Sequence, residues 1–277
     1  MGAPGEPRHR AKRSLGQNFL VDANLQRKIV EALGATSHGE VVEIGPGQGA
    51  LTRHLVGTVG RLVLVELDDG LAKALERQYG QRDDVDVVHG DILKVRLAEH
   101  LRRPEAARVV GNIPYNITTP ILFRLLERPR PLDIILMVQE EVADRIVAVP
   151  GSSAYGALAV GVQSVARAQR LFRVSRGAFR PVPKVESAVV RITPLRPEPL
   201  SLPQEERLRV LVRAAFQWRR KQLGKILRDH PDLALGGPVA AEVAQDLGLD
   251  LSDRPERLDP ATFIRLAERI AGAGGGP

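Results

Sequence analysis

The sequence predicts an open, doubly wound α/β sheet with an antiparallel hairpin at its edge, followed by a small all-α domain. Apolar runs of strand length alternate with helical patterns between residues 40 and 149. These runs are apolar throughout rather than at every second residue, as in parallel strands that are covered on both faces. After residue 204 only helical patterns occur, which predicts the second domain.

The first part of the chain supplies the sheet. Asp22 is expected to cap a first helix that Gly34 ends. Between them, Leu25, Ile29 and Leu33 recur every four residues and form one apolar face. Strands are predicted at residues 40–44, 61–66, 85–89, 108–111 and 132–138. Helices are predicted at residues 50–56, 70–79, 121–126 and 140–149.

A change of pattern near residue 150 predicts how the sheet ends. Residues 155–166 have a helical pattern, but 169–174 and 186–192 are strand-like with no helix between them. We expect these two strands to be antiparallel and to close the sheet edge. The proline-rich segment 194–203 is typical of a linker, and helices are predicted after it at residues 205–216, 239–247 and 260–270. The predicted parts are a flexible basic arm at 1–15, a sheet domain at 16–197 and a helical domain at 198–277.

The composition excludes several classes of protein. The chain of 277 residues has no cysteine, which excludes a disulfide scaffold and cysteine-ligated zinc or iron–sulfur sites. Its apolar runs, such as 134–138, are far shorter than the ~20 residues that span a bilayer. No apolar stretch follows the basic residues near the start, so no secretory signal is expected. We expect a cytoplasmic monomer that binds neither membrane nor metal.

Basic charge is concentrated in two segments of a chain whose net charge is +7. Residues 1–30 hold six Lys or Arg and two acids, and residues 201–230 hold eight and three. Residues 231–277 are acidic, with four basic and eight acidic residues. A polyanionic partner such as nucleic acid would favour this distribution, but basic helices are also common surface features. Charge alone therefore permits nucleic-acid binding without showing it.

A glycine-rich turn follows the first predicted strand. Gly45, Gly47 and Ala50 satisfy the pattern G-x-G-x-x-G/A, and Glu66 ends the next strand about twenty residues later. The glycines allow a sharp turn and a close approach of a ligand to the backbone. The Glu66 carboxylate can accept hydrogen bonds from both hydroxyls of a ribose. The pattern predicts a nucleoside site but does not decide between a dinucleotide and another nucleoside.

Polar groups also follow the next two strands. Asp91 comes after the third strand, where its carboxylate can accept a hydrogen bond from an adenine amine, and Asn112 comes after the fourth. The carboxyl ends of parallel strands meet at one edge of the sheet. We therefore expect Glu66, Asp91 and Asn112 to line one crevice at the point where the strand order reverses.

The segment Asn112–Tyr115, with the sequence Asn-Ile-Pro-Tyr, carries the sharpest chemical signal. The exocyclic amine of adenine is a poor nucleophile because its lone pair is delocalised into the ring. Two acceptors, the Asn112 side-chain oxygen and the Ile113 carbonyl, would favour a pyramidal nitrogen, and Pro114 would fix the backbone beside them. The Tyr115 ring can stack on the purine, which is worth ~1–3 kcal/mol. The segment therefore predicts group transfer to an adenine amine.

Six separated motifs, in this order, resemble those of the ribosomal RNA adenine dimethyltransferases, most closely the small-subunit group. The motifs are Ser14–Leu20, Glu43–Ala50, Glu66, Gly90–Ile92, Asn112–Tyr115 and Ala178–Val189. The resemblance spans residues 13–270 and implies a Rossmann-like class I methyltransferase sheet with S-adenosyl-L-methionine as methyl donor. It implies dimethylation of the N6 amines of two adjacent adenosines in the 3′-terminal hairpin loop of 16S rRNA, within the immature small ribosomal subunit.

The resemblance also implies roles for individual residues at the donor site. Gly45 would approach the methionine end, Glu66 would hold the ribose and Asp91 the adenine, and Asn112 would meet both donor and target. The implied donor-binding residues are Gln17, Asn18, Leu20, Gly45, Gly47, Glu66, Leu67, Asp91, Ile92 and Asn112.

Two later segments resemble the family's RNA-contacting parts. Phe179, in a proline-rich loop between the last two strands, would stack on the flipped target base opposite Tyr115, and the alternative is a buried ring that braces the loop. A basic stretch beside Trp218 suits a phosphate surface with a stacking ring, or else only a solvated helix face. The implied catalytic residues are Asn112, Ile113, Pro114, Tyr115 and Phe179. The implied RNA-binding residues are Lys184, Arg219, Arg220 and Lys221.

Three other functions compete with this interpretation. The large-subunit adenine methyltransferases of macrolide resistance share the chemistry, and Ile113 is somewhat more typical of them, but 155–158 and the 179–185 loop resemble the small-subunit group better. A non-catalytic RNA-binding or transcription factor on the same fold would not need the intact Asn112–Tyr115 segment. A nicotinamide-dependent dehydrogenase would explain the glycine turn but would leave that segment without a role.

Overall fold

The computed structural model of the chain describes Lys12 and residues 16–273. The predicted arm at 1–15 lies outside the described residues, apart from Lys12. The described residues form two compact units. The first contains the chain up to Ala143 together with Gln169–Pro194, and the second contains Asp144–Ala168 together with the chain from Leu195.

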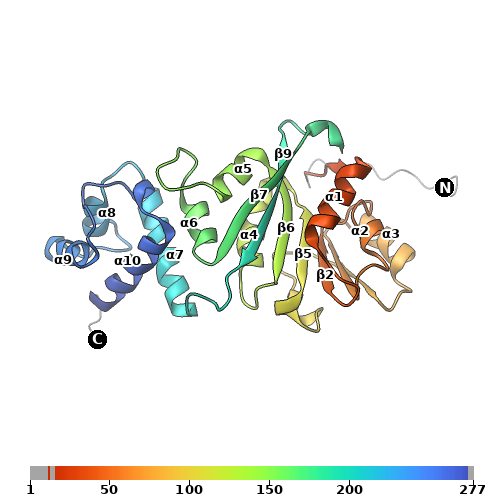
Figure 1. Ribbon diagram of the computed structural model, residues 1–277, viewed down its shortest axis with the longest axis horizontal. Helices are drawn as coiled ribbons and strands as arrows, with labels where there is room; N and C mark the ends of the chain where they lie inside the picture. Colours follow the sequence, from red (N-terminus) through yellow and green to blue (C-terminus); the bar gives the residue numbers. More distant parts are fainter. Residues whose placement is uncertain (1–11, 13–15, 274–277) are drawn as a thin grey trace. The chain divides into compact units, whose positions relative to one another are not determined.

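One sheet runs through the first unit, and its strands in the described residues lie in the order β4-β3-β2-β5-β6-β9-β7. Figure 1 labels β2, β5, β6, β9 and β7 of this sheet. Neighbouring strands from β4 to β6 are parallel, whereas β9 is antiparallel to β6. The predicted doubly wound sheet with an antiparallel hairpin at its edge is therefore confirmed, and the hairpin strands are β7 and β9. The strands are β2 Glu40–Ile44, β3 Arg61–Glu66, β4 Val85–His89, β5 Arg108–Asn112, β6 Asp133–Gln139, β7 Ala166–Val174 and β9 Ser187–Pro194.

Both faces of the central strands are buried. Val41, Leu62 and Leu64 belong to one core cluster. Val42 and Val63, which alternate with them along the same strands, are also 0% exposed. Successive side chains of a strand point to opposite faces of the sheet. The strands are therefore apolar at most positions, because each face packs against its own layer.

The first helix begins and ends at the residues that the sequence indicates. Asp22 Oδ1 accepts hydrogen bonds from the backbone N–H groups of Asn24 and Leu25 at 2.9 and 3.0 Å, which caps the helix. Gly34 ends it with φ 58°, a left-handed conformation that costs glycine little. The α-helices before residue 150 are α1 Ala23–Leu33, α2 Thr52–Leu55, α3 Asp69–Tyr79, α4 Thr118–Leu125 and α5 Glu140–Ile146.

Two features of the structure differ from the sequence predictions. A small antiparallel sheet joins β1 (Phe19–Leu20) to β8 (Phe179–Arg180), and neither strand is predicted because two residues carry no periodicity. The prediction of helix up to residue 166 is wrong at its end, because β7 already begins at Ala166. Pairing with β9 extends this strand, so tertiary contacts outweigh local propensity.

The second unit is helical and has its own core. Ser201 and Gln204 form a capping box at the start of α7, after the proline-rich linker. The Tyr155 hydroxyl donates a hydrogen bond to the Leu258 carbonyl at 2.8 Å. The helices of this unit are α6 Ala157–Gln163, α7 Leu202–Gln217, α8 Leu223–Asp229, α9 Gly237–Leu247 and α10 Pro260–Ala273. Of these, α8 is absent from the sequence predictions.

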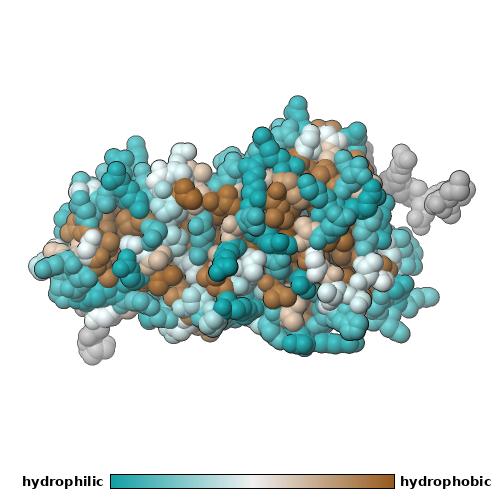
Figure 2. Space-filling model, viewed as in Figure 1, coloured by the Kyte–Doolittle hydropathy of each residue, from teal (hydrophilic) through white to brown (hydrophobic). Residues whose placement is uncertain are grey.

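The surface shown in Figure 2 is mostly hydrophilic, with hydrophobic residues in separate groups between the hydrophilic ones. Among the described residues, none of the helices combines the length and the apolar composition that a membrane crossing needs. In the same part of the chain, His, Asp and Glu side chains do not gather in a group of three that could hold a metal ion.

Candidate active site

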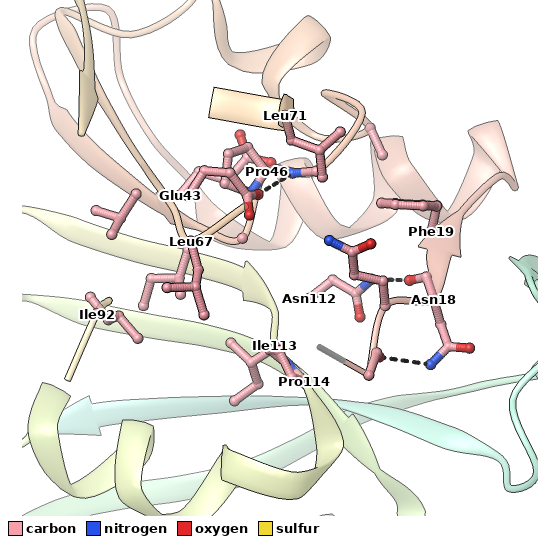
Figure 3. Close-up of a pocket in the computed structure, with 18 of the residues that line it drawn as sticks. Asn18, Phe19, Glu43, Pro46, Leu67, Leu71, Ile92, Asn112, Ile113 and Pro114 are labelled. Carbon is pink, nitrogen blue, oxygen red and sulfur yellow. Dashed lines mark hydrogen bonds between the residues drawn. The ribbon is translucent and has the colours of Figure 1, made fainter. Parts of the chain in front are cut away.

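The carboxyl ends of β2, β3, β4 and β5 surround a cavity of about 480 Å³ in the first unit. The strand order reverses between β2 and β5, and ligands of open α/β sheets bind at such a switch point. The strand register aligns Glu66 with His89 and Asn112 with Met137 at this edge. Figure 3 shows Asn18 and Phe19 on one side of the cavity, and Leu67 and Ile92 on the opposite side.

The structure brings the predicted donor-binding and amine-binding residues together. Residues predicted at both places line this one cavity: Gln17, Asn18, Leu20, Gly45, Gly47, Glu66, Leu67, Asp91, Ile92, Asn112, Ile113, Pro114 and Tyr115. The predicted residues outside the lining are Phe179, Lys184, Arg219, Arg220 and Lys221. Ser14 and Leu15 of the first motif lie outside the described residues.

The glycine turn leaves its backbone open to a ligand. Gly45 and Gly47 both have positive φ, 63° and 59°, which other residues adopt only with strain. A Cβ on Gly47 would lie 3.1 Å from the Phe19 ring, closer than ordinary contact. Any larger residue would thus push against Phe19 and fill the cradle, so the turn suits a ligand that approaches the backbone closely.

Glu66 joins this turn to the end of β3. Its Oε2 atom accepts a hydrogen bond from the Gly47 N–H, and its Oε1 atom accepts one from the Asp68 N–H, both at 2.9 Å. Burial raises the pKa of the Glu66 carboxyl, while these hydrogen bonds lower it. Because each carboxylate oxygen has two lone pairs, both can still accept from a ligand. A fixed bidentate acceptor beside the glycine cradle matches the two hydroxyls of a ribose.

Asn112 lies at the centre of the cavity wall (Figure 3). Its Nδ2 atom donates a hydrogen bond to the Asn18 carbonyl at 2.8 Å. Asn18 in turn donates from its own Nδ2 to the Gly16 carbonyl at 3.1 Å. This chain of contacts fixes the amide plane and leaves Oδ1 as the acceptor that Asn112 offers to a ligand.

Tyr115 is held by a residue that the sequence analysis includes in the 178–189 motif but gives no role of its own. The hydroxyl groups of Tyr115 and Ser187 lie 2.6 Å apart, and Ser187, the first residue of β9, is fully buried. Burial raises the pKa of the Tyr115 phenol, so it stays neutral. The sequence carries no signal for this pair, because the sheet brings together two residues far apart in the chain.

Glu43 is a second residue that the sequence analysis leaves without a role. It lines the cavity, is 2% exposed and accepts a hydrogen bond from the Thr52 hydroxyl at 2.7 Å. Burial raises the pKa of its carboxyl to about 7, and the charge of Glu66 adds to this effect. The available sequence signal was a carboxylate between the two apolar residues Val42 and Ile44.

The free energy of unfolding is expected to fall as the pH rises from about 4.5 to 7, because of Glu43. The unfolded chain loses this proton near the ordinary pKa of 4.5, whereas the fold retains it up to about 7. Between these values the folded state binds more protons, so its stability decreases with pH and levels off above 7. Glu43→Gln should remove most of this pH dependence, which amounts to a few kcal/mol in the free energy of unfolding between pH 4.5 and 7. Urea unfolding at several pH values in this range measures it. Parallel pH profiles for the two proteins would contradict the assignment.

Phe179 and the predicted RNA-binding residues lie elsewhere. Phe179 is 0% exposed and belongs to the core cluster, because its strand pairs with β1. Stacking on a base would require this ring to leave the core. Lys184, Arg220 and Lys221 are exposed. Arg219 donates from Nε to Glu256 Oε2 at 2.9 Å, within the second unit.

Comparison with known proteins identifies the family of this chain. The family model described as "Ribosomal RNA adenine dimethylase" matches residues 8–270. The chain belongs to the ribosomal RNA adenine dimethylase family. It is therefore a methyltransferase that acts on adenine in ribosomal RNA, as the resemblance predicts, and a nicotinamide dinucleotide is not needed to explain the glycine turn.

Individual members of this family are similar along nearly the whole chain. "Ribosomal RNA small subunit methyltransferase A" of Pseudomonas aeruginosa is 43% identical over 264 residues, which cover 95% of this chain and 96% of the relative. The protein of the same name from Maridesulfovibrio salexigens is 43% identical over 266 residues, 96% and 97% of the two chains.

Two solved structures share the fold of this dimethylase. A dimethyladenosine transferase from Plasmodium falciparum superposes with a TM-score of 0.81 at 25% identity, covering 92% of this chain and 98% of that one. The 23S rRNA methyltransferase ErmE superposes with a TM-score of 0.70 at 27% identity, covering 92% and 100%. Both likenesses extend across the described sheet and helices and support the Rossmann-like fold.

Proposed function

We propose that this enzyme uses S-adenosyl-L-methionine to dimethylate the N6 amines of two adjacent adenosines in the 3′-terminal hairpin loop of small-subunit rRNA. The observation that carries the proposal is the amide of Asn112, which is fixed by Asn18 in the wall of the cavity at the switch point. The choice of subunit is supported by the P. aeruginosa relative, whose name specifies the small subunit.

The residues of the cavity fit the methyl donor. The open glycine cradle at Gly45 and Gly47 would take its methionine end, Glu66 the ribose and Asp91 the adenine amine. Leu67 and Ile92 would pack against the adenine ring, and Gln17, Asn18 and Leu20 would close the other side. When bound, the donor supplies a methyl group on a positively charged sulfur, which is already activated for transfer.

The chain's own task is to prepare the acceptor nitrogen. Asn112 Oδ1 and the Ile113 carbonyl would accept hydrogen bonds from the two amine hydrogens, so that the lone pair is no longer delocalised into the ring. The nitrogen can then form its bond to the methyl carbon as the carbon–sulfur bond breaks, and its proton leaves to solvent. Tyr115, held by Ser187, would stack on the base and keep the nitrogen in line.

Basic residues in each unit would contact phosphates of the rRNA. Lys184 is exposed in the loop after β8, and Arg220 and Lys221 are exposed in the turn after α7. Phosphate contacts of this kind position a nucleic acid without reading its bases. In this proposal the enzyme acts as a monomer on the immature small subunit in the cytoplasm.

The test is methylation of purified ribosomal subunits that lack this modification. We expect the chain with S-adenosylmethionine to produce two dimethyladenosines in the 3′ hairpin of small-subunit RNA, as seen by mass spectrometry of nuclease fragments. Large subunits, treated in parallel, should gain no methyl group. Methylation of the large subunit instead would favour the macrolide-resistance alternative. Tight RNA binding without any transfer would favour a non-catalytic factor.

Removing only the phenol oxygen of Tyr115 should slow transfer modestly. Tyr115→Phe loses the hydrogen bond to Ser187, worth about 1 kcal/mol, and should lower the single-turnover rate roughly fivefold. Tyr115→Ala also loses the stacking ring, worth ~1–3 kcal/mol, and should be slower still. Ser187→Ala is the matched variant, and adding it to Tyr115→Phe should cost nothing more. Additive losses in the double variant would show that the two hydroxyls act independently.

A further inference from the structure

The turn between α7 and α8 lies in the second unit (Figure 1). Its side chains line a surface hollow of about 330 Å³. We propose that this hollow binds one unpaired nucleotide of the rRNA, with the base against Trp218 and the phosphate at Arg220 and Lys221. The proposal rests on the proposed function, because it takes rRNA as the substrate. It adds a second nucleotide site to the cavity where methyl transfer occurs. The residues that line the hollow are Gln217, Trp218, Arg219, Arg220, Lys221 and Lys225.

The Trp218 ring is held in place by His230, on which it packs. The centroids of the two rings lie 5.0 Å apart, with the planes at 59°. His230 is 3% exposed, and its Nδ1 atom accepts a hydrogen bond from the Asp232 N–H at 3.2 Å. Its Nε2 atom therefore donates to Gln217 Oε1, at 3.0 Å. Because the imidazole is held at both nitrogens, the indole that rests on it is pre-positioned for stacking.

In the described part of the chain, two cations at the hollow have no carboxylate partner. Within the described residues, Arg220 and Lys221 are exposed and form no ion pair, and the lining contains no acidic residue. Their neighbours are engaged: Arg219 pairs with Glu256 at 2.9 Å and Lys225 with Asp229 at 2.8 Å. The hollow therefore offers positive charge to a ligand at the same place as its aromatic ring.

This combination favours an unpaired nucleotide over a paired one. A ring that stacks on a base needs the face of that base, which a duplex covers on both sides. Proteins that bind single strands combine aromatic platforms with cationic grooves in this way. A hollow of about 330 Å³ is at the small end of ligand sites and suits one nucleotide rather than a helix.

The experiment uses the emission of Trp218, which is the only tryptophan of the chain. The full-length protein is titrated with an adenosine hexanucleotide RNA, with a fully paired RNA duplex and with inorganic tripolyphosphate. We expect the hexanucleotide to quench the emission to saturation, at concentrations at least tenfold lower than the duplex. Tripolyphosphate, which carries charge but no base, should compete for binding without comparable quenching.

Four variants separate the ring from the charges. Arg220→Gln combined with Lys221→Gln should weaken the quenching transition roughly tenfold, while Arg265→Gln, an exposed charge on α10, should leave it unchanged. In fluorescence anisotropy with labelled hexanucleotide, Trp218→Phe should bind nearly as well as the wild type, and Trp218→Ala roughly tenfold more weakly. Because Arg220 and Lys221 are exposed, their variants test the hollow even if Trp218→Ala does not fold.

Two outcomes would overturn the proposal. Equal quenching by tripolyphosphate and RNA would reduce the hollow to a phosphate surface. Unchanged emission during RNA binding would leave the hollow unused. Methylation of small subunits by the same preparation separates this failure from that of the proposed function: transfer with silent emission refutes the hollow alone, whereas absent transfer refutes the function.

Discussion

Asn112→Ala is expected to lower the rate of methyl transfer by roughly two to three orders of magnitude, the largest effect of any single substitution in this site. The substitution removes Oδ1, one of the two acceptors that, in the proposed mechanism, would make the adenine nitrogen pyramidal. The glycine turn at Gly45 and Gly47, which is proposed to hold the donor, remains in place, so donor affinity should change much less than the rate. Single-turnover transfer to small-subunit RNA and calorimetric binding of S-adenosylmethionine measure the two quantities separately.

The structure adds one qualification that the motif alone does not supply. Asn112 also donates to the Asn18 carbonyl at 2.8 Å, so its loss frees the segment that leads into β1. Asn112→Asp separates the two roles, because it retains acceptor oxygens but sets a carboxylate against the Asn18 carbonyl. Asn24→Ala, an exposed asparagine of α1, is the matched control and should transfer at the wild-type rate. Full transfer activity in Asn112→Ala would exclude the acceptor role.

Much of the fold could be predicted because the strongest signals are local. Signals that depend only on neighbouring residues are confirmed by the structure. They include the strands at 40–44 and 61–66, the helix cap at Asp22 and the helix end at Gly34. The elements that were missed depend on distant partners instead. The strand pair formed by β1 and β8 exists only because two short segments meet in space.

The residues of the site also differ in whether local sequence or distant contacts set their positions. Glu66 and Asn112 follow predicted strands, so their place at one sheet edge can be read from the order of elements. Ser187 approaches Tyr115 only through the antiparallel pairing of β9 with β6, which sets its position across the sheet. The position of Phe179 could not be predicted from its motif. The motif contains the aromatic residue, but the ring is buried because its strand pairs with β1, which lies outside the motif.

The second large effect is expected at Glu66, on donor binding rather than on the rate. Glu66→Ala removes both oxygens that would accept the ribose hydroxyls. Hydrogen bonds to a charged group are worth about 1.5–3 kcal/mol each, so two of them correspond to a loss of affinity of roughly a hundredfold or more. The rate at saturating donor should change little, because Glu66 ends β3 and is proposed to hold the ribose, whereas Asn112 ends β5 and is proposed to meet the target amine. Calorimetric titration with S-adenosylmethionine and single-turnover transfer measure these two effects.

Glu66→Gln distinguishes ligand binding from support of the turn. Glu66 accepts from the Gly47 and Asp68 N–H groups, so the alanine variant also leaves two backbone donors without their partner and should lower the melting temperature of the free protein. Glutamine has one acceptor oxygen, retains part of this support and should lose only about tenfold in donor affinity. Glu31→Ala, on the exposed face of α1, controls for the loss of one negative charge. Donor binding by Glu66→Ala as tight as that of the wild type would contradict the proposed role of Glu66. Leu67 and Ile92 are apolar and cannot accept the hydrogen bonds of the ribose, so other polar residues would then have to hold it.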